Sequence, residues 1–254
     1  MNTIKKLFIP LVGVGLLAAS LGLNAQPATA DLVGNALIHG DRPAADAADD
    51  ARRMPLEVLA FAGLQPGMTV FELEAGGGYY TEIMSRAVGP AGAVIMHNPP
   101  SFDSFLGDSV AQRVANDRLP NVRVTRTNFD VLEAPDNSVD MVTWILGPHE
   151  LGYAPDGESL GDAETAFAEI SRVLKPGGLF LAIDHIGPPG SGVEVGGTLH
   201  RIREEVVTGY AAAVGLEMVR NSNLHRNDAD PLDNSVFDPS IQGQTSKFVA
   251  LYRK

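Results

Sequence analysis

The fold of this chain is decided by one stretch, Val70-Phe71-Glu72-Leu73-Glu74-Ala75-Gly76-Gly77-Gly78-Tyr79-Tyr80-Thr81-Glu82-Ile83-Met84. It begins as a short apolar strand, passes through three consecutive glycines and continues with a helical pattern. Because glycine lacks a side chain, such a turn lets the backbone N–H groups of a helix N-terminus approach a ligand closely. A tight strand-to-helix turn can also require glycine for steric reasons alone, and this second interpretation stays open.

The bulk composition limits the class of protein. The length of 254 residues and the hydrophobic fraction of 44% fit one sizeable globular domain. The formal charge of -12 repels phosphate backbones, so we expect no nucleic acid among the partners. The sequence has no Cys, which excludes disulfides, Cys-ligated zinc, iron–sulfur clusters and a thiol nucleophile.

The N-terminus has the pattern of a targeting segment. Lys5 and Lys6 precede an apolar run over 7–23, and Ala28-Thr29-Ala30 supplies a small-x-small cleavage site. We therefore expect a signal peptide over 1–30 and an exported protein, periplasmic or secreted. An uncleaved membrane anchor is the alternative, since the apolar run reaches the lower length limit for a spanning helix. After cleavage no stable membrane insertion is expected.

The rest of the chain, 31–254, is predicted to form a single α/β domain. Strands are predicted at 68–73, 93–97, 122–127, 139–146, 179–186, 216–220 and 245–252. Helices are predicted at 55–63, 79–88, 102–116, 162–174 and 198–214. This alternation implies βαβ crossovers and a mostly parallel sheet covered on both faces. The polar stretch 31–53 is either an arm over the later site or a solvated leader.

Three motifs in this order resemble those of class I S-adenosylmethionine-dependent methyltransferases. The first is the stretch from Glu72 to Gly78, and the others are Asp136-Asn137-Ser138-Val139-Asp140-Met141-Val142 and Leu174-Lys175-Pro176-Gly177-Gly178. The resemblance implies a three-layer, Rossmann-like sheet of seven strands, mostly parallel with the last antiparallel. It also implies S-adenosyl-L-methionine as the cofactor, bound across the carboxyl ends of the strands.

The resemblance is strongest to a group of exported bacterial proteins known as predicted methyltransferases. The segments that carry this similarity are Gly76 to Glu82, Asp184-His185, His200-Arg201 and Asn221 to Lys247. It covers nearly all of the chain from about Pro43 to Arg253.

The same resemblance assigns residues to the cofactor. Glu72 and the backbone of Gly76, Gly77 and Gly78 would lie near its amino-acid end, and Tyr79 would either cover it or pack on a helix face. Glu74 stands where the family carries Gly, so its side chain either turns outward or narrows the pocket. Asn98 stands where an acidic residue takes the ribose hydroxyls, and either Asn128 or Asp130 would contact the adenine.

Methyl transfer needs a positioned nucleophile and a group that takes up its proton. The candidates are His149, Asp184 and His185 at predicted strand ends, and His200, which opens the next predicted helix. Each could instead be a structural hydrogen-bonding residue. The four could also bind a divalent metal, but the sequence has no compact ligand motif, so no metal is expected.

The leading functional hypothesis is a methyltransferase that acts on a small-molecule acceptor outside the cytoplasm. The alternative is a noncatalytic envelope protein that keeps the methyltransferase fold as a ligand-binding module. A nicotinamide-dependent oxidoreductase is disfavoured, because its fingerprint requires Gly or Ala at Thr81 and an acid at Asn98. The sequence predicts no oligomeric state.

Overall fold

The computed structural model describes residues 25–254. The basic residues and the apolar run of the predicted signal peptide lie outside this range. The predicted cleavage site at Ala28–Ala30 lies within the first described helix, α1 (Ala25–Leu37). No helix within 25–254 combines the length and the apolar character that crossing a membrane requires.

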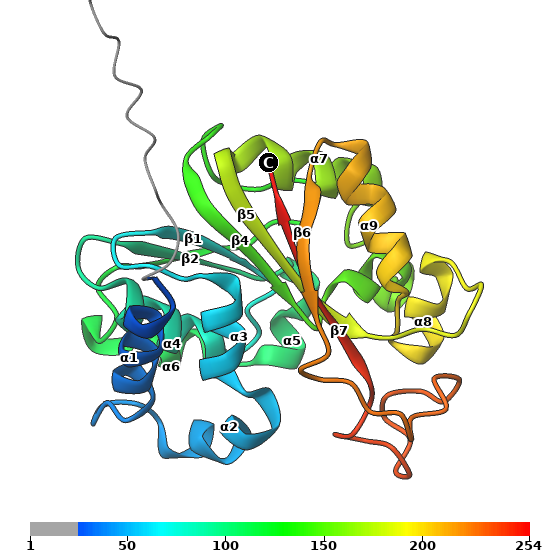
Figure 1. Cartoon of the computed structure of the whole chain (residues 1–254), viewed down its shortest axis with the longest axis horizontal. Coiled ribbons are helices and arrows are strands. Elements are labelled where there is room, and N and C mark those ends of the chain that lie inside the picture. The colour runs from blue at the N-terminus through cyan, green and yellow to red at the C-terminus, as the bar shows by residue number, and fades with distance from the viewer. Residues whose placement is uncertain (1–24) are drawn as a thin grey trace, which may run out of the picture.

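A seven-stranded sheet forms the centre of the molecule (Figure 1). Its strands follow the order β3-β2-β1-β4-β5-β7-β6, and β7 runs antiparallel to both of its neighbours. The bounds are β1 Thr69–Leu73, β2 Ala93–His97, β3 Val122–Thr125, β4 Val139–Ile145, β5 Leu174–His185, β6 Glu217–Ser222 and β7 Lys247–Arg253. The predicted mostly parallel sheet with an antiparallel last strand is confirmed.

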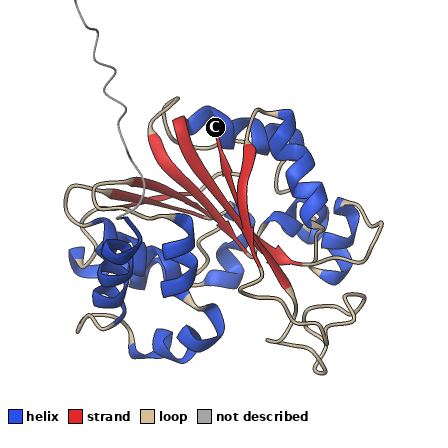
Figure 2. Cartoon of the chain, in the orientation of Figure 1, coloured by secondary structure: helices blue, strands red, loops and turns tan. Residues whose placement is uncertain are grey.

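Helices lie on both sides of this sheet (Figure 2). The remaining α-helices are α2 Ala47–Arg53, α3 Pro55–Ala62, α4 Tyr79–Val88, α5 Asp103–Leu106, α6 Ser109–Val114, α7 Ala163–Val173, α8 Gly196–Leu199 and α9 Glu204–Ala213. Single 3-10 turns are η1 Ala44–Asp46, η2 Pro100–Phe102, η3 Ala115–Asp117, η4 Pro148–Gly152, η5 Pro155–Gly157 and η6 Val193–Val195.

Two hydrophobic clusters fill the space between the sheet and the helices. Phe71 of β1 and Phe180 of β5 belong to the cluster that includes side chains of α7 and α9. Val70 and Leu181, one position away on the same strands, belong to the cluster under α1, α3 and α4. Because successive strand residues face opposite sides, the near-continuous apolar strands supply both clusters.

Two predicted helices are wrong in detail. The helix expected over 102–116 is broken at Gly107, where φ is 51° and the chain leaves α5 before α6 begins. The helix expected over 198–214 is interrupted between α8 and α9, because His200 adopts the left-handed conformation with φ 53°. Ser109 and Arg113, which follow the first interruption, border a cavity described below, and His200 at the second belongs to a cluster of polar side chains.

The N-terminal stretch 31–53 forms an arm, and the alternative of a solvated leader is wrong. Helix α1 packs against α3 and α4, with Val33 and Ala36 buried. The turn η1 and helix α2 then extend the arm toward the loop between β1 and α4 (Figure 1).

Candidate functional site

A cavity of about 430 Å³ lies at the carboxyl ends of β1 and β4, against the triple-glycine bend. Its wall includes Glu72, Gly76, Gly77 and Tyr79 from the stretch around the bend. The N-terminal arm closes another side with Asp46, Asp49 and Arg53, and Leu146 follows β4. The predicted ligand-binding turn therefore does border a cavity.

The bend needs glycine for two physical reasons. Gly76 and Gly78 have φ values of 56° and 82°, which residues with a Cβ rarely adopt. A Cβ on Gly78 would also lie 2.8 Å from Cγ of Arg113. Arg113 in α6 packs over the bend and donates a hydrogen bond from Nε to the Gly77 carbonyl at 2.9 Å.

Glu72 ends β1 as a buried acid beside the bend. Its carboxylate accepts a hydrogen bond from the Thr81 hydroxyl in the first turn of α4. Burial disfavours the charged form and outweighs that hydrogen bond, which raises the pKa of Glu72 to about 8. Glu72 therefore lines the cavity as an acid that can ionise when a cation is brought beside it.

The side chain of Glu74, which stands where the resembling family carries Gly, points toward β4. Its backbone takes the left-handed conformation with φ 56°, and Oε2 accepts a hydrogen bond from Trp144 Nε1 at 3.0 Å. A Cβ on Gly147 would lie 2.2 Å from this oxygen, so the carboxyl group occupies the space that glycine leaves there. Burial, together with the negative charge of Glu150, raises the pKa of Glu74 well above its ordinary value.

The predicted ribose and adenine residues do not line the cavity. Asn98 makes two hydrogen bonds with the Gly76 peptide, with Oδ1 accepting from N at 2.8 Å and Nδ2 donating to O at 3.0 Å. Asn128 donates to the Ser159 carbonyl at 3.4 Å, and Asp130 accepts from the backbone of Asp162 at 3.2 Å. Asn98 thus stabilises the backbone of the bend without lining the cavity.

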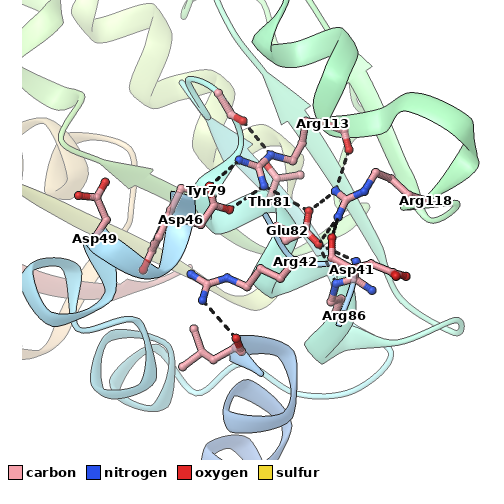
Figure 3. A network of polar contacts seen from close by, with 12 residues as sticks. Asp41, Arg42, Asp46, Asp49, Tyr79, Thr81, Glu82, Arg86, Arg113 and Arg118 are labelled. Carbon is pink, nitrogen blue, oxygen red and sulfur yellow. Dashed lines mark hydrogen bonds and ion pairs between the residues drawn. The ribbon is translucent and has the colours of Figure 1, made fainter. Parts of the chain in front are cut away.

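The N-terminal arm is fastened over the bend by polar contacts (Figure 3). Arg113 makes two hydrogen bonds to the Asp46 carboxylate, at 2.7 and 3.1 Å. Tyr79, at the start of α4, donates from its hydroxyl to Asp50 at 2.6 Å. The buried Glu82 joins Arg113, Arg86 and Arg118 in the same network.

Sequence reasoning did not find this network. Tyr79 and Glu82 lie in the stretch that carries the glycine bend, but their partners in the arm and in the region of α6 belong to no motif and are far from it in the sequence. The polar character of the stretch around Asp46 was the one available signal.

Two of the predicted catalytic residues meet at the ends of β4 and β5. Asp184, fully buried, accepts from His149 Nδ1 at 2.8 Å and from the His149 backbone N–H at 2.7 Å. Burial opposes the charged imidazole, but the negative charges of Asp184 and Glu150 outweigh it. They raise the pKa of His149 to about 10.

His200 joins this pair through Glu150, a residue that was not among the predicted ones. His149 Nε2 lies 3.1 Å from Glu150 Oε1 and 3.3 Å from His200 Nδ1. His200 Nδ1 lies 3.6 Å from the same Glu150 oxygen. Burial opposes ionisation of Glu150, but its hydrogen bonds with the two histidines outweigh burial and lower its pKa. Adjacency to His149 was the signal in the sequence.

His185, the fourth predicted residue, stands apart from this cluster. Its Nδ1 lies 2.7 Å from the Thr245 hydroxyl, and its ring centroid lies 6.1 Å from that of His149. Burial and the nearby charge of Lys247 lower the pKa of His185 well below its ordinary value. His185 is therefore a neutral hydrogen-bonding residue beside the cluster.

Part of the sequence matches a known protein family. Residues 72–182, from the end of β1 into β5, match the model of a family described as "Methyltransferase domain". The match begins at Glu72 and spans the bend and the His149 region. The matched residues are those that carry the three motifs resembling S-adenosylmethionine-dependent methyltransferases.

Curated relatives match about half of the chain. The ubiquinone/menaquinone biosynthesis C-methyltransferase UbiE of Hydrogenovibrio crunogenus is 31% identical over 132 residues, which are 50% of this chain and 45% of that protein. The UbiE of Shewanella halifaxensis is 33% identical over 129 residues, 50% of this chain and 46% of that protein. The chain thus spans less than half the length of these relatives.

Solved structures share the fold. An S-adenosylmethionine-dependent methyltransferase from Aquifex aeolicus superimposes with a TM-score of 0.58 at 22% identity, over 82% of this chain and 95% of that one. One from Mesorhizobium loti gives a TM-score of 0.58 at 14% identity, over 81% and 99%. At these identities the similarity establishes the sheet and helix arrangement.

Proposed function

We propose that this chain is an exported S-adenosylmethionine-dependent methyltransferase that acts on a small-molecule acceptor. The observation that carries the proposal is the cavity of about 430 Å³ against the triple-glycine bend. The family match over 72–182 and the fold support it.

The cavity suits the amino-acid end of the cofactor. An α-amino acid carries an ammonium and a carboxylate, so its site needs both signs of charge. The wall offers carboxyl groups from Glu72, Asp46 and Asp49 for the ammonium, and the guanidinium of Arg53 for the carboxylate. A Cβ on Gly76 would have no described atom within 4 Å, so there is open space on that side of the bend, while the Gly76 N–H and carbonyl are both bonded to Asn98.

When bound, S-adenosylmethionine supplies a methyl group activated by its sulfonium. The chain's own residues bind and orient the reactants and exclude water around them. The arm does part of this, because Asp46 and Tyr79 fasten it over the bend. The methyl acceptor would bind near the hydrogen-bonded His149 and Asp184, at the ends of β4 and β5. The names of the UbiE relatives support a small-molecule acceptor.

Calorimetric titration of the purified protein with S-adenosylmethionine and with its demethylated product tests the proposal. We expect one saturable site for each ligand and weaker binding by Glu72→Ala, which removes a carboxyl group from the cavity wall. Glu205→Ala is the control, because the Glu205 side chain is 75% exposed and does not line the cavity. Absence of binding by the wild type up to millimolar ligand would reject the proposal.

A noncatalytic binding protein with this fold is the second candidate. It is favoured by Asn98, whose side chain bonds the Gly76 peptide instead of presenting a carboxylate to the ribose. Incubation with methyl-labelled cofactor and a panel of small nucleophiles separates the two. Labelled product supports the enzyme, and tight cofactor binding with no transfer to any acceptor supports the binding module.

Export rests on the pattern of Lys5, Lys6, the apolar run and the Ala28–Ala30 site. Fusion of residues 1–30 to a reporter enzyme that is active only outside the cytoplasm tests it. Reporter activity, with cleavage after Ala30 at the fusion junction found by N-terminal sequencing, is the expected result. An inactive reporter, with the uncleaved fusion protein found in the cytoplasm, would contradict export.

A further inference from the structure

Three side chains of metal-ligand type converge on one point at the carboxyl ends of β4 and β5. They are His149 and Glu150 in the turn η4, and His200 at the end of α8. Their nearest donor atoms, Nε2 of His149, Oε1 of Glu150 and Nδ1 of His200, are separated by 3.1, 3.3 and 3.6 Å. The three atoms thus form a nearly equilateral triangle.

The size of this triangle matches one face of a zinc tetrahedron. Zinc bonds of about 2.0–2.1 Å place tetrahedral ligands about 3.4 Å apart, whereas ligands at right angles would lie about 3.0 Å apart. An ion about 2.05 Å from all three donors would make angles of roughly 100–120° between them, around the tetrahedral value of about 109°. The fourth position stays open for water or a ligand.

The surroundings of His149 are those of a metal ligand. Its Nδ1 is engaged by the Asp184 carboxylate at 2.8 Å, so Nε2 is the nitrogen left to face Glu150 and His200. Histidine ligands commonly carry such a carboxylate on the second ring nitrogen, which fixes the ring and raises its basicity. Asp184 is fully buried, and its carboxylate orients the His149 ring through this contact.

One oxygen of the Glu150 carboxylate, Oε2, lacks a hydrogen-bond partner among the described residues. Glu150 is 8% exposed, and this oxygen is buried. An unpaired buried carboxylate oxygen is destabilising, because desolvation is not compensated. His149 and His200 lie against the other oxygen, Oε1, and favour the charged carboxylate, so a bound cation would compensate the oxygen that they leave unpaired.

His200 reaches the cluster through an unfavourable backbone conformation and a close contact between α8 and η4. His200 takes the left-handed conformation, φ 53° and ψ 49°, which is unfavourable for a residue with a Cβ and is typical of functional sites. A Cβ on Gly196 would lie 1.9 Å from the His149 carbonyl oxygen, so α8 and η4 touch backbone to backbone. This contact brings His200 to His149.

We propose that His149, Glu150 and His200 form a site for a divalent transition-metal ion, with Zn²⁺ as the ion that the triangle fits best. Two imidazoles and one carboxylate are donors suited to such ions. The site goes beyond the proposed methyl transfer and does not depend on it. It lies beside the cofactor cavity, since Glu74 both lines that cavity and interacts electrostatically with His149 and Glu150.

Calorimetric titration of the chelator-treated protein with Zn²⁺, without any cofactor, tests the site. One equivalent is expected to bind the wild type. Glu150→Gln, which keeps the shape and removes the charge, and His200→Asn, which tolerates the left-handed backbone, should each weaken binding by more than about 100-fold. Asp184→Asn should weaken it by about 10–100-fold, as expected of a positioning residue. His39→Gln is the control, because His39 lies outside the cluster with a side chain 45% exposed.

Visible absorption of the Co²⁺-loaded wild type supplies a second measurement that needs no variant. Strong ligand-field bands of a tetrahedral nitrogen and oxygen site are expected, and one equivalent of Zn²⁺ should abolish them. The proposal is overturned if the wild type binds neither ion stoichiometrically up to millimolar concentration. Zn²⁺ binding that is unchanged in folded Glu150→Gln and His200→Asn, as judged by circular dichroism, overturns it equally.

Discussion

Asp184 holds His149 by two hydrogen bonds at once, one from ring Nδ1 at 2.8 Å and one from the backbone N–H at 2.7 Å. A third comes from the backbone N–H of His185 at 2.7 Å. The end of β5 is thereby tied to the turn that follows β4. The Asp184 side chain therefore orients the His149 ring and also holds the backbone of His149 in place.

In the metal-free protein, substitution Asp184→Asn is expected to lower the free energy of unfolding by about 3 kcal/mol, because it leaves the charged His149 without its buried partner. Asn also has one acceptor oxygen for the three donors that Asp184 serves. Urea unfolding followed by circular dichroism measures the change. Asp140→Asn is the control, since Asp140 accepts from the Thr69 N–H and from Lys175 but keeps 28% of its side chain exposed. Equal losses in the two variants would contradict the special role of Asp184.

Substitution Gly78→Ala tests how closely Arg113 approaches the bend. The Cβ would lie 2.8 Å from Arg113 Cγ and 2.9 Å from Met96 Cε, and the Arg113 head group cannot retreat without leaving Asp46. Gly67→Ala is the matched control, with φ 78° against 82° and no described atom within 4 Å of the added Cβ. Both variants carry the left-handed penalty of about 1–2 kcal/mol.

The steric term is therefore isolated by the difference between the two alanine variants. Gly78→Ala should lose at least about 1 kcal/mol more in the free energy of unfolding than Gly67→Ala. It should also lose affinity for the demethylated cofactor product, which Gly67→Ala should retain. If the two variants lose the same stability and affinity, the packing of Arg113 on the bend does not constrain this position.

Glu72 predicts a pH dependence of stability. Its pKa is raised from an ordinary 4.5 to about 8, so the folded protein holds a proton there that the unfolded chain has lost. The stabilisation is complete below about pH 4.5 and is lost as the pH rises through about 8, with a slope of at most about 1.4 kcal/mol per pH unit. Glu72→Gln mimics the protonated acid and lacks this slope.

The measurement is the difference in unfolding free energy between Glu72→Gln and the wild type at pH 5, 6.5 and 8. The difference should be small at pH 5 and should grow in favour of the variant toward pH 8. Because other titrating groups are common to both proteins, their contributions cancel. A constant difference across the three pH values would show that Glu72 is ionised in the folded protein throughout.

The sheet could be predicted because its information is local. Apolar strands, glycine turns and the Leu174 to Gly178 motif each occupy a few adjacent residues, and the alternation of strands and helices then gives the topology. The proximity of His149 and Asp184 could also be predicted, since the carboxyl ends of neighbouring parallel strands lie close together. The hydrogen-bond partner of each side chain could not be predicted. Asn98 had the expected place in the sequence but bonds the Gly76 peptide.

The parts that could not be predicted depend on contacts between distant segments. The Asp46–Arg113 pair spans 67 residues, and neither residue belongs to a motif. His200 reaches Glu150 at a point where its left-handed backbone interrupts a helix expected to continue. Helical periodicity describes one segment at a time, so it cannot report a stop that packing against another segment imposes.

The Asp46–Arg113 ion pair predicts that the arm can be released from the bend. The Arg113 and Asp46 side chains are 9% and 12% exposed, so Asp46→Ala should lower the free energy of unfolding by about 2 kcal/mol. Arg113 keeps its contacts with Glu82 and with the Gly77 carbonyl, and this should spare the rest of the domain. The affinity for the demethylated cofactor product should also fall, because Asp46 belongs to the cavity wall.

Hydrogen exchange measured by mass spectrometry locates the effect. In Asp46→Ala, the amides of α2 and of the stretch around Gly76 should exchange faster, while those of β4 and β5 stay protected. Asp41→Ala is the control on the same arm, because that side chain is 72% exposed and substitution there should change stability by less than about 0.5 kcal/mol. If α2 stays as protected in Asp46→Ala as in Asp41→Ala, the arm is held by Tyr79 and Asp50, which bond at 2.6 Å, and the ion pair is dispensable for closing the cavity.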